Sequence, residues 1–212
     1  MKTLFVEAKS DVDALGVLNK LKDLPKKIGL VSTVQYLHQL PNVKYKLEKK
    51  GHVVLIGGQI IGCNVSNALK IGKDIDLYLY IGSGEFHPVE VAYKTKKKVV
   101  IANPATNQVS YITDKEIKNF EKKRNAKVSQ FILAKKIGII VTIKPGQENL
   151  RMAINFKKRL KKDSFIFVTN EVRVEDLDNF REIDFWVNTA CPRIEMPRVL
   201  WINDIPLQAQ NI

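Results

Sequence analysis

Cysteine is the residue type of this chain best suited to hold a metal centre, and the chain has two, Cys63 and Cys191. They lie far apart, so no local CxxC or zinc-finger spacing is present. Each follows an apolar run that we expect to be a strand: 52–57, through the loop GGQIIG, for Cys63, and 185–190 for Cys191. Because sites in parallel α/β sheets form beyond the carboxyl ends of strands, both thiols are expected at such edges. Buried, inert thiols are the alternative.

The residues beside each cysteine favour an accessible sulfur. Cys63 lies just ahead of an expected short helix that Asn64 is placed to cap. A helix N-terminus favours the thiolate form of a nearby cysteine. Pro192 follows Cys191 directly, and its fixed backbone angle turns the chain away from the preceding strand. Both sulfurs are therefore expected to face whatever lies beyond the sheets.

A third loop, GSGEFHP at 82–88, is expected on the same edge as Cys63. Gly82 and Gly84 would let backbone N–H groups approach an anionic or polar ligand closely. A plain turn explains a lone GxG about as well. His87 precedes Pro88 at an expected helix start, so a capping or packing role is open for it beside a ligand-binding role.

Strands and helices alternate along the whole chain. Short apolar runs predict strands at 4–8, 27–33, 52–57, 74–82, 98–103, 108–112, 135–142, 164–169, 185–190 and 199–203. Amphipathic stretches predict helices at 11–22, 35–51, 64–72, 88–95, 114–135, 148–162 and 174–181. This alternation is typical of an α/β protein, and we expect parallel four-stranded sheets flanked by helices.

A repeated strand opening divides the chain into two similar domains. KKIGIIVT at 135–142 echoes KKIGLVST at 26–33. We therefore expect a domain at 27–130 and a second one at 131–212. Residues 1–26 supply a strand and a helix that have no sheet of their own.

The composition excludes several classes of protein. With 45% hydrophobic and 27% charged residues, the chain reads as an ordinary globular protein. No run approaches the roughly 18 apolar residues that indicate a membrane span. The first residues carry acids where a signal peptide would be uncharged, so we expect a cytoplasmic protein without a membrane partner. Two cysteines argue against a disulfide framework.

The net charge of +13 has two readings. It is either an electrostatic footprint for RNA, or for a partner docked on RNA, or a lysine-rich solvated surface. The aromatic residues do not interleave with the basic runs as they do in RNA-recognition modules. RNA is therefore not expected to be the main partner.

Five blocks of the sequence carry a resemblance to a known family. They are STVQYL (32–37), GQIIGCNVSNA (58–68), YIGSGEFHP (80–88), IANP (101–104) and WVNTACPRIE (186–195). In this order they resemble the second and third domains of the archaeal-type diphthamide-synthesis enzymes, the 2-(3-amino-3-carboxypropyl)histidine synthases. The resemblance runs from about Phe5 to Leu207.

The resemblance implies a specific chemistry. Members of this family have three similar α/β domains, each of which donates one cysteine to a [4Fe-4S] cluster, and the archaeal enzymes are homodimers. The open iron binds S-adenosylmethionine, whose reductive cleavage yields a 3-amino-3-carboxypropyl radical. That group is added to a histidine of translation elongation factor two, the first step of diphthamide biosynthesis.

By position, the resemblance assigns roles to residues of this chain. Cys63 matches the cluster ligand of the second domain, and Cys191 matches that of the third. Residues expected to contact the cofactor S-adenosylmethionine are Gly82, Ser83, Gly84, Phe86, His87 and Gln147. The segment IKPGQEN around Gln147 is poorer in glycine than the family's pattern.

The family's first domain, with its own cysteine, has no counterpart here. Residues 1–26 resemble only its last strand and helix. Three explanations stay open: a separate polypeptide supplies the first domain and the third cysteine, the chain is truncated, or it is a non-catalytic paralogue that supports an active partner. The alternative function is a basic module that docks on elongation factor two or on RNA.

Overall fold

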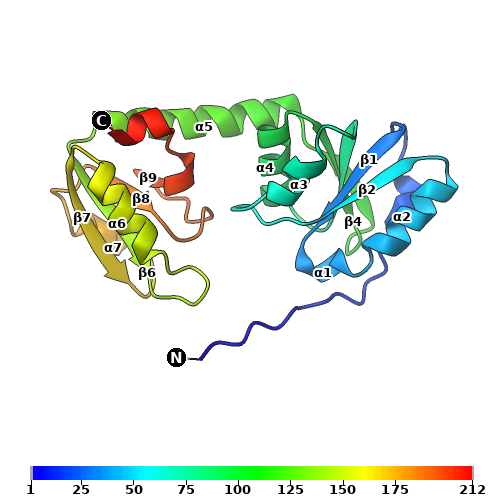
Figure 1. Ribbon diagram of the computed structural model, residues 1–212, viewed down its shortest axis with the longest axis horizontal. Helices are drawn as coiled ribbons and strands as arrows, with labels where there is room; N and C mark the ends of the chain where they lie inside the picture. The colour runs from blue at the N-terminus through cyan, green and yellow to red at the C-terminus, as the bar shows by residue number, and fades with distance from the viewer. Residues whose placement is uncertain (1, 212) are drawn as a thin grey trace. The chain divides into compact units, whose positions relative to one another are not determined.

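The chain forms two units, each built around one β-sheet. The structure is a computed structural model that describes residues 2–211 (Figure 1). The contacts divide the chain into unit 1, Met1–Phe120, and unit 2, Glu121–Ile212. The division falls within helix α5 (Asp114–Leu133), which confirms the helix predicted at 114–135. The domain bounds expected from the repeat, 27–130 and 131–212, stay a prediction.

Unit 1 holds a mixed sheet of five strands in the order β2-β1-β3-β4-β5. Strands β1 to β4 are parallel, and β5 runs antiparallel to β4 at one edge. The sheet therefore has the expected four parallel strands and one additional strand. The strands are β1 (Lys27–Ser32), β2 (Val53–Gln59), β3 (Leu77–Ile81), β4 (Lys98–Asn103) and β5 (Gln108–Tyr111).

Helices cover both faces of this sheet, which is why its central strands read as unbroken apolar runs. One core packs the sheet against α1 (Val34–Leu37), α2 (Leu40–Lys49) and a 3-10 turn, η1 (Val17–Lys20). The other packs it against α3 (Ser66–Ile71) and α4 (Phe86–Thr95) (Figure 1). Every residue of β3 is buried.

The strand expected at 4–8 and the helix expected at 11–22 are not formed. Residues 2–9 are an extended segment outside any sheet, and Leu4 and Val6 are 85% and 81% exposed. Only η1 is helical in the second stretch, where Val17 and Leu18 are buried in unit 1. A strand is defined by its ladder partner, and no strand within residues 2–211 pairs with this segment. Its assignment to another domain stays a prediction.

Unit 2 holds four parallel strands in the order β7-β6-β8-β9, as expected. They are β6 (Lys136–Thr142), β7 (Asp163–Thr169), β8 (Phe185–Asn188) and β9 (Val199–Trp201). The helical segments of this unit beyond α5 are α6 (Leu150–Arg159), α7 (Val174–Asp178) and the 3-10 turns η2 (Ile202–Asp204) and η3 (Leu207–Asn211). The α/β class is confirmed, with four parallel strands in each unit and one antiparallel edge strand in unit 1.

The repeat seen in the sequence has a structural counterpart. β1 and β6 occupy the same place in their sheets, each between the second and third strands of its unit. Asp76 accepts a hydrogen bond from the Lys27 N–H at 3.1 Å, and Asp184 accepts one from the Lys136 N–H at 2.8 Å. Each aspartate thus joins the start of its unit's third strand to the start of the first. Backbone N–H groups of Lys136 and Lys135 hold the pKa of the Asp184 carboxyl below its usual value.

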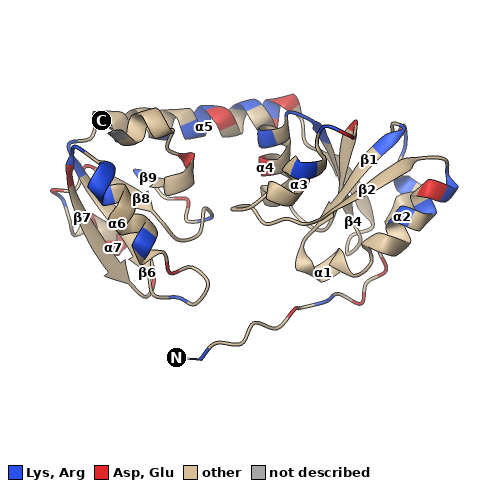
Figure 2. Cartoon of the chain, in the orientation of Figure 1, with Lys and Arg blue, Asp and Glu red and all other residues tan. Residues whose placement is uncertain are grey.

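The charged residues are spread over both units (Figure 2). Within residues 2–211, no helix is long and apolar enough to cross a membrane.

Gly138 of β6 sets the packing of unit 2, because a methyl group there would overlap the ring of Trp186. Trp186 is 1% exposed and packs in the same core as Ile140. We predict that Gly138→Ala lowers the free energy of unfolding by about 1–3 kcal/mol, the usual penalty for overpacking a core. Urea unfolding followed by far-ultraviolet circular dichroism, which reports the secondary structure of both units, measures it.

Gly16→Ala is the matched control, since no atom lies within 4 Å of the added methyl group. It should leave the midpoint unchanged or slightly raised. Equal effects of the two substitutions would contradict this account of the core.

Candidate functional site

Cys63 lies in a tight turn beyond the carboxyl end of β2. Ile61 and Asn64 close the turn with two backbone hydrogen bonds, from Asn64 N to Ile61 O at 2.9 Å and from Ile61 N to Asn64 O at 3.1 Å. Cys63 is half-buried between them. The Asn64 side chain accepts the N–H of Ser66 at 3.0 Å, although the residue at the N-cap position of α3 is Val65. The turn and the helix start are therefore held as one piece.

The loop at 82–88 packs directly on this turn. Gly62 is buried under the ring of Phe86, and a methyl group at Gly62 would overlap that ring. Phe86 is the first residue of α4, which begins two residues before the expected start at Pro88. The structure thus brings Phe86 against the residue next to Cys63. Gly62 is required here because only a residue without a side chain lets the ring approach.

The side chain of Tyr80 supports the loop at 82–88. The Tyr80 hydroxyl donates to the carbonyl of Ser83 at 3.3 Å, and Gly82 lies against the same tyrosine. The rings of Tyr80 and Phe86 lie 6.5 Å and 5.3 Å from the ring of half-buried His87. Burial raises the pKa of Tyr80 to about 12, so its hydroxyl remains a donor at neutral pH. Sequence reasoning did not identify this role of Tyr80, because the residue resembles any other buried residue of a strand.

Two of the expected contact residues are open to solvent. Ser83 and Gly84 are exposed, and no atom lies within 4 Å of the position of a Cβ on Gly84. The φ of Gly84 is +72°, a backbone conformation that favours glycine. The loop therefore presents backbone groups, and not bulky side chains, at this edge of the sheet.

In unit 2, an asparagine holds the loop of Cys191. Asn188, the last residue of β8, is 1% exposed. Its side chain donates to the carbonyl of Cys191 at 2.7 Å and accepts the N–H of Ala190 at 2.8 Å. Ile194 N–H also donates to the Cys191 carbonyl, at 3.0 Å. Cys191 itself is half-buried. We call the two hydrogen bonds of the Asn188 side chain the Asn188 bracket. An asparagine in an otherwise apolar strand was the sequence signal that could have identified it.

A second asparagine ties the loop at 143–149 to the Cys191 loop. Asn149 precedes α6 and donates its side-chain N–H to the Thr189 carbonyl at 2.8 Å. Gln147 is half-buried in the same loop, where its backbone N–H closes a turn to Lys144 at 3.0 Å. The contact to the cysteine loop is thus made by Asn149, and the role expected for Gln147 stays a prediction.

Each unit therefore presents one thiol at the carboxyl edge of its sheet. Within residues 2–211, no three His, Cys, Asp or Glu side chains gather closely enough to hold a metal ion. The predicted site residues of unit 1 lie in one neighbourhood, formed by the Cys63 turn, the loop at 82–85 and the start of α4. Cys191 and Gln147 lie in adjoining loops of unit 2.

Two successive α/β units, each with a thiol beyond the carboxyl ends of its parallel strands, define a modular protein suited to thiolate ligation. A family model described as "Putative diphthamide synthesis protein" matches residues 1–202. The chain belongs to this family, which confirms the resemblance seen in the sequence.

Two relatives are synthases of archaea. The 2-(3-amino-3-carboxypropyl)histidine synthase of Pyrococcus horikoshii is 37% identical over 210 residues, which cover 92% of this chain and 59% of the relative. The enzyme of the same name from Methanocaldococcus jannaschii is 29% identical over 209 residues, with coverages of 92% and 56%. The chain thus spans less than three fifths of the length of these relatives.

A solved structure has the same fold. The crystal structure of Dph2 from Pyrococcus horikoshii with a 4Fe-4S cluster matches with a TM-score of 0.79 and 33% sequence identity. The match covers 92% of this chain and 61% of that chain.

The Asn188 bracket yields a testable prediction for Cys191. Asn188→Ala removes both side-chain hydrogen bonds of the loop, and each is worth about 0.5–1.5 kcal/mol. The Cys191 thiol should then react several-fold faster with a thiol reagent such as dithionitrobenzoate, because the loop opens more often. Mass spectrometry of the labelled peptides separates the two cysteines.

Cys63 in the same sample is the internal control, since it lies in unit 1 whereas Asn188 and its two hydrogen bonds lie in unit 2. A rate at Cys191 equal to that of the wild type would contradict the role given to Asn188. An equal acceleration at both cysteines would instead indicate global destabilisation.

Proposed function

We propose that this chain is part of a 2-(3-amino-3-carboxypropyl)histidine synthase. In this proposal it helps to transfer the 3-amino-3-carboxypropyl group of S-adenosylmethionine to a histidine of translation elongation factor two, the first step of diphthamide biosynthesis. The observation that supports it is the half-buried cysteine at the carboxyl edge of both units in a member of the diphthamide-synthesis family.

The residues present fit a [4Fe-4S] cluster. Such clusters are held by cysteine thiolates, and Cys63 and Cys191 are the ligands proposed here. When bound, the cluster supplies the electron that cleaves S-adenosylmethionine. Thr142 supports a bound group at the edge of unit 2: it is 2% exposed, and its hydroxyl has no hydrogen-bond partner within residues 2–211. A buried hydroxyl of this kind usually has a partner.

The chain's own residues would bind and orient S-adenosylmethionine. Backbone N–H groups of the exposed loop at 82–84 suit its carboxylate. Phe86 packs on Gly62 beside the Cys63 turn, and the His87 ring lies against Phe86. Gln147 is the proposed contact from unit 2. Ser83 holds its loop in place by accepting the Tyr80 hydroxyl on its carbonyl.

The proposed cluster needs one more thiolate than these 212 residues contain. The chain has two cysteines, whereas three protein ligands leave one iron open for the substrate. We propose that a further α/β domain supplies the third ligand, in an assembly with a dimeric arrangement. Elongation factor two is the proposed protein partner.

A second candidate function is a docking module without a cluster. The net charge of +13 favours it, because a basic surface attracts RNA or an acidic protein. In that case, affinity for the partner would fall steeply with salt and would not depend on either cysteine.

Iron content tests the proposal. The chain is reconstituted anaerobically with iron and sulfide, alone and together with a first-domain fragment of a relative, and its iron, sulfide and visible absorbance are measured. We expect about four irons to be bound only in the mixture, as a [4Fe-4S] cluster requires. Cys63→Ala and Cys191→Ala should each lower iron retention beyond the ~10- to 100-fold typical of losing a supporting residue.

Lys70→Ala, on the exposed surface of α3 next to the Cys63 turn, is the matched control and should load iron normally. Full loading of Cys63→Ala would rule out its role as a ligand. If no sample binds iron, the docking module becomes the better account.

A further inference from the structure

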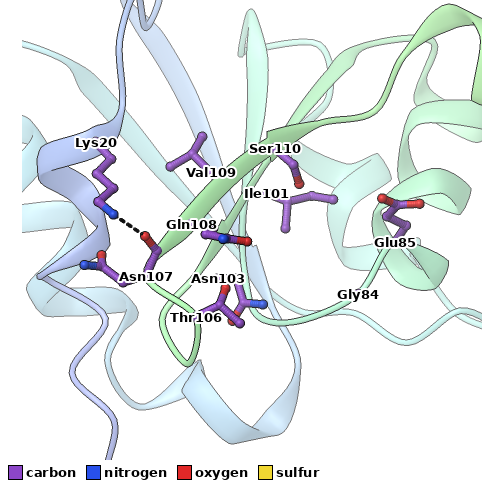
Figure 3. A pocket seen from close by; sticks show the side chains of 10 residues that line it. All are labelled: Lys20, Gly84, Glu85, Ile101, Asn103, Thr106, Asn107, Gln108, Val109 and Ser110. Carbon is purple, nitrogen blue, oxygen red and sulfur yellow. Dashed lines mark hydrogen bonds between the residues drawn. The ribbon is translucent and has the colours of Figure 1, made fainter.

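A polar cavity of about 470 Å³ opens in unit 1 beside the loop at 82–85. It lies at the carboxyl end of β4, where β4 turns into β5 (Figure 3). Its lining includes Lys20, Glu85, Ile101, Asn103, Val109 and Ser110. Of the positions assigned above to S-adenosylmethionine, the lining includes only Gly84.

The wall formed by the β4–β5 turn is preorganised. The Asn103 side chain accepts the N–H of Ala105 at 3.1 Å, and Asn107 adopts a left-handed conformation with φ +51°. Lys20 donates to the carbonyl of Asn107 at 2.7 Å, as the dashed line in Figure 3 shows. The cavity therefore has a defined shape before any ligand binds, which lowers the entropic penalty of binding.

The opposite wall of the cavity is connected to the Cys63 turn through adjacent residues. Glu85 lies across the cavity from Lys20 (Figure 3) and is followed by Phe86. Phe86 packs on Gly62, the neighbour of Cys63. One side of the α4 start thus faces the thiol turn, and the residue before it lines the cavity. A molecule in the cavity is therefore held next to the proposed chemistry.

The chemistry of the lining matches a polypeptide better than a nucleoside. Only Ile101 and Val109 are apolar, and the lining holds no aromatic ring on which an adenine could stack. Most of the other lining residues carry an amide or a hydroxyl, and the two charged side chains are those of Lys20 and Glu85. β5 ends the order of its sheet, so no strand within residues 2–211 pairs with its outer edge. Such an edge can hydrogen-bond an extended peptide.

We propose that this cavity receives the protein segment that carries the acceptor histidine. This inference rests on the proposed function and identifies where its protein substrate binds. The Glu85 carboxylate accepts a hydrogen bond from an imidazole N–H and so orients the ring, while the backbone of the segment lies along β5. Carboxylates commonly orient imidazole rings in this way, by accepting one ring N–H.

Peptide binding to the 212-residue chain tests this inference without requiring catalysis. The probe is a fluorescein-labelled synthetic peptide that contains the acceptor histidine of elongation factor two and its neighbours, followed by fluorescence anisotropy. Glu85→Gln should weaken binding about 10- to 100-fold, the effect expected for one charge-assisted hydrogen bond. Ser110→Trp should abolish binding, because the indole fills the cavity.

Each variant has a matched control. Glu48→Gln removes an exposed carboxylate from α2, outside the cavity, and Tyr111→Trp places an indole on the neighbouring residue of β5, which does not line the cavity. Both should bind the peptide as the wild type does. Unchanged binding by Glu85→Gln and Ser110→Trp, or no saturable binding by the wild type, overturns the inference.

Two further outcomes separate this inference from the proposed function. Displacement of the peptide by S-adenosylmethionine from a wild type without cluster would assign the cavity to the nucleoside, and so overturn the inference. Peptide binding that persists in Cys63→Ala, together with normal iron loading of Glu85→Gln, supports it. If the peptide binds as expected but no iron is loaded, the proposed cluster is contradicted and the assignment of the cavity is not.

Discussion

Parallel strand pairing is the constraint on which the rest of this structure depends. Parallel neighbours place all their carboxyl ends at one edge, so loops that are distant in sequence meet there. In unit 1, this brings the Cys63 turn after β2 together with the loop after β3 and the turn after β4. In unit 2, it joins the loops after β6 and β8 through Asn149. The cysteines have neighbours suited to chemistry because of this alignment.

The two units use different devices to fix the loop that carries their cysteine. In unit 1, apolar contact does so: the ring of Phe86 covers Gly62, and a reciprocal pair of backbone hydrogen bonds closes the turn. In unit 2, a buried asparagine side chain accepts the N–H of Ala190 and donates to the carbonyl of Cys191. Both devices leave the sulfur half-buried, which suits a ligand that must remain accessible while being held in position.

The proposed thiol site and the proposed acceptor cavity meet at the start of α4. Phe86 closes the side of the thiol turn, while Glu85 lines a polar cavity with the β4–β5 turn. Two adjacent residues thus contact the two proposed sites, so a substrate in the cavity would lie close to the thiol turn. The preorganised walls of the cavity also restrict the acceptor segment to few orientations. Such orientation of a substrate lowers the entropic part of the activation barrier.

The sequence by itself determined the α/β class, the parallel sheets and the loops on which both cysteines lie, because alternating apolar runs and amphipathic stretches report burial directly. Only the tertiary structure decided that Phe86 packs on Gly62 and that Asn188 brackets Cys191, since such contacts join segments whose spacing carries no signal. It also decided the extended form of residues 4–8, which local propensity predicted to be a strand. A strand needs hydrogen-bonding neighbours, and propensity cannot supply them.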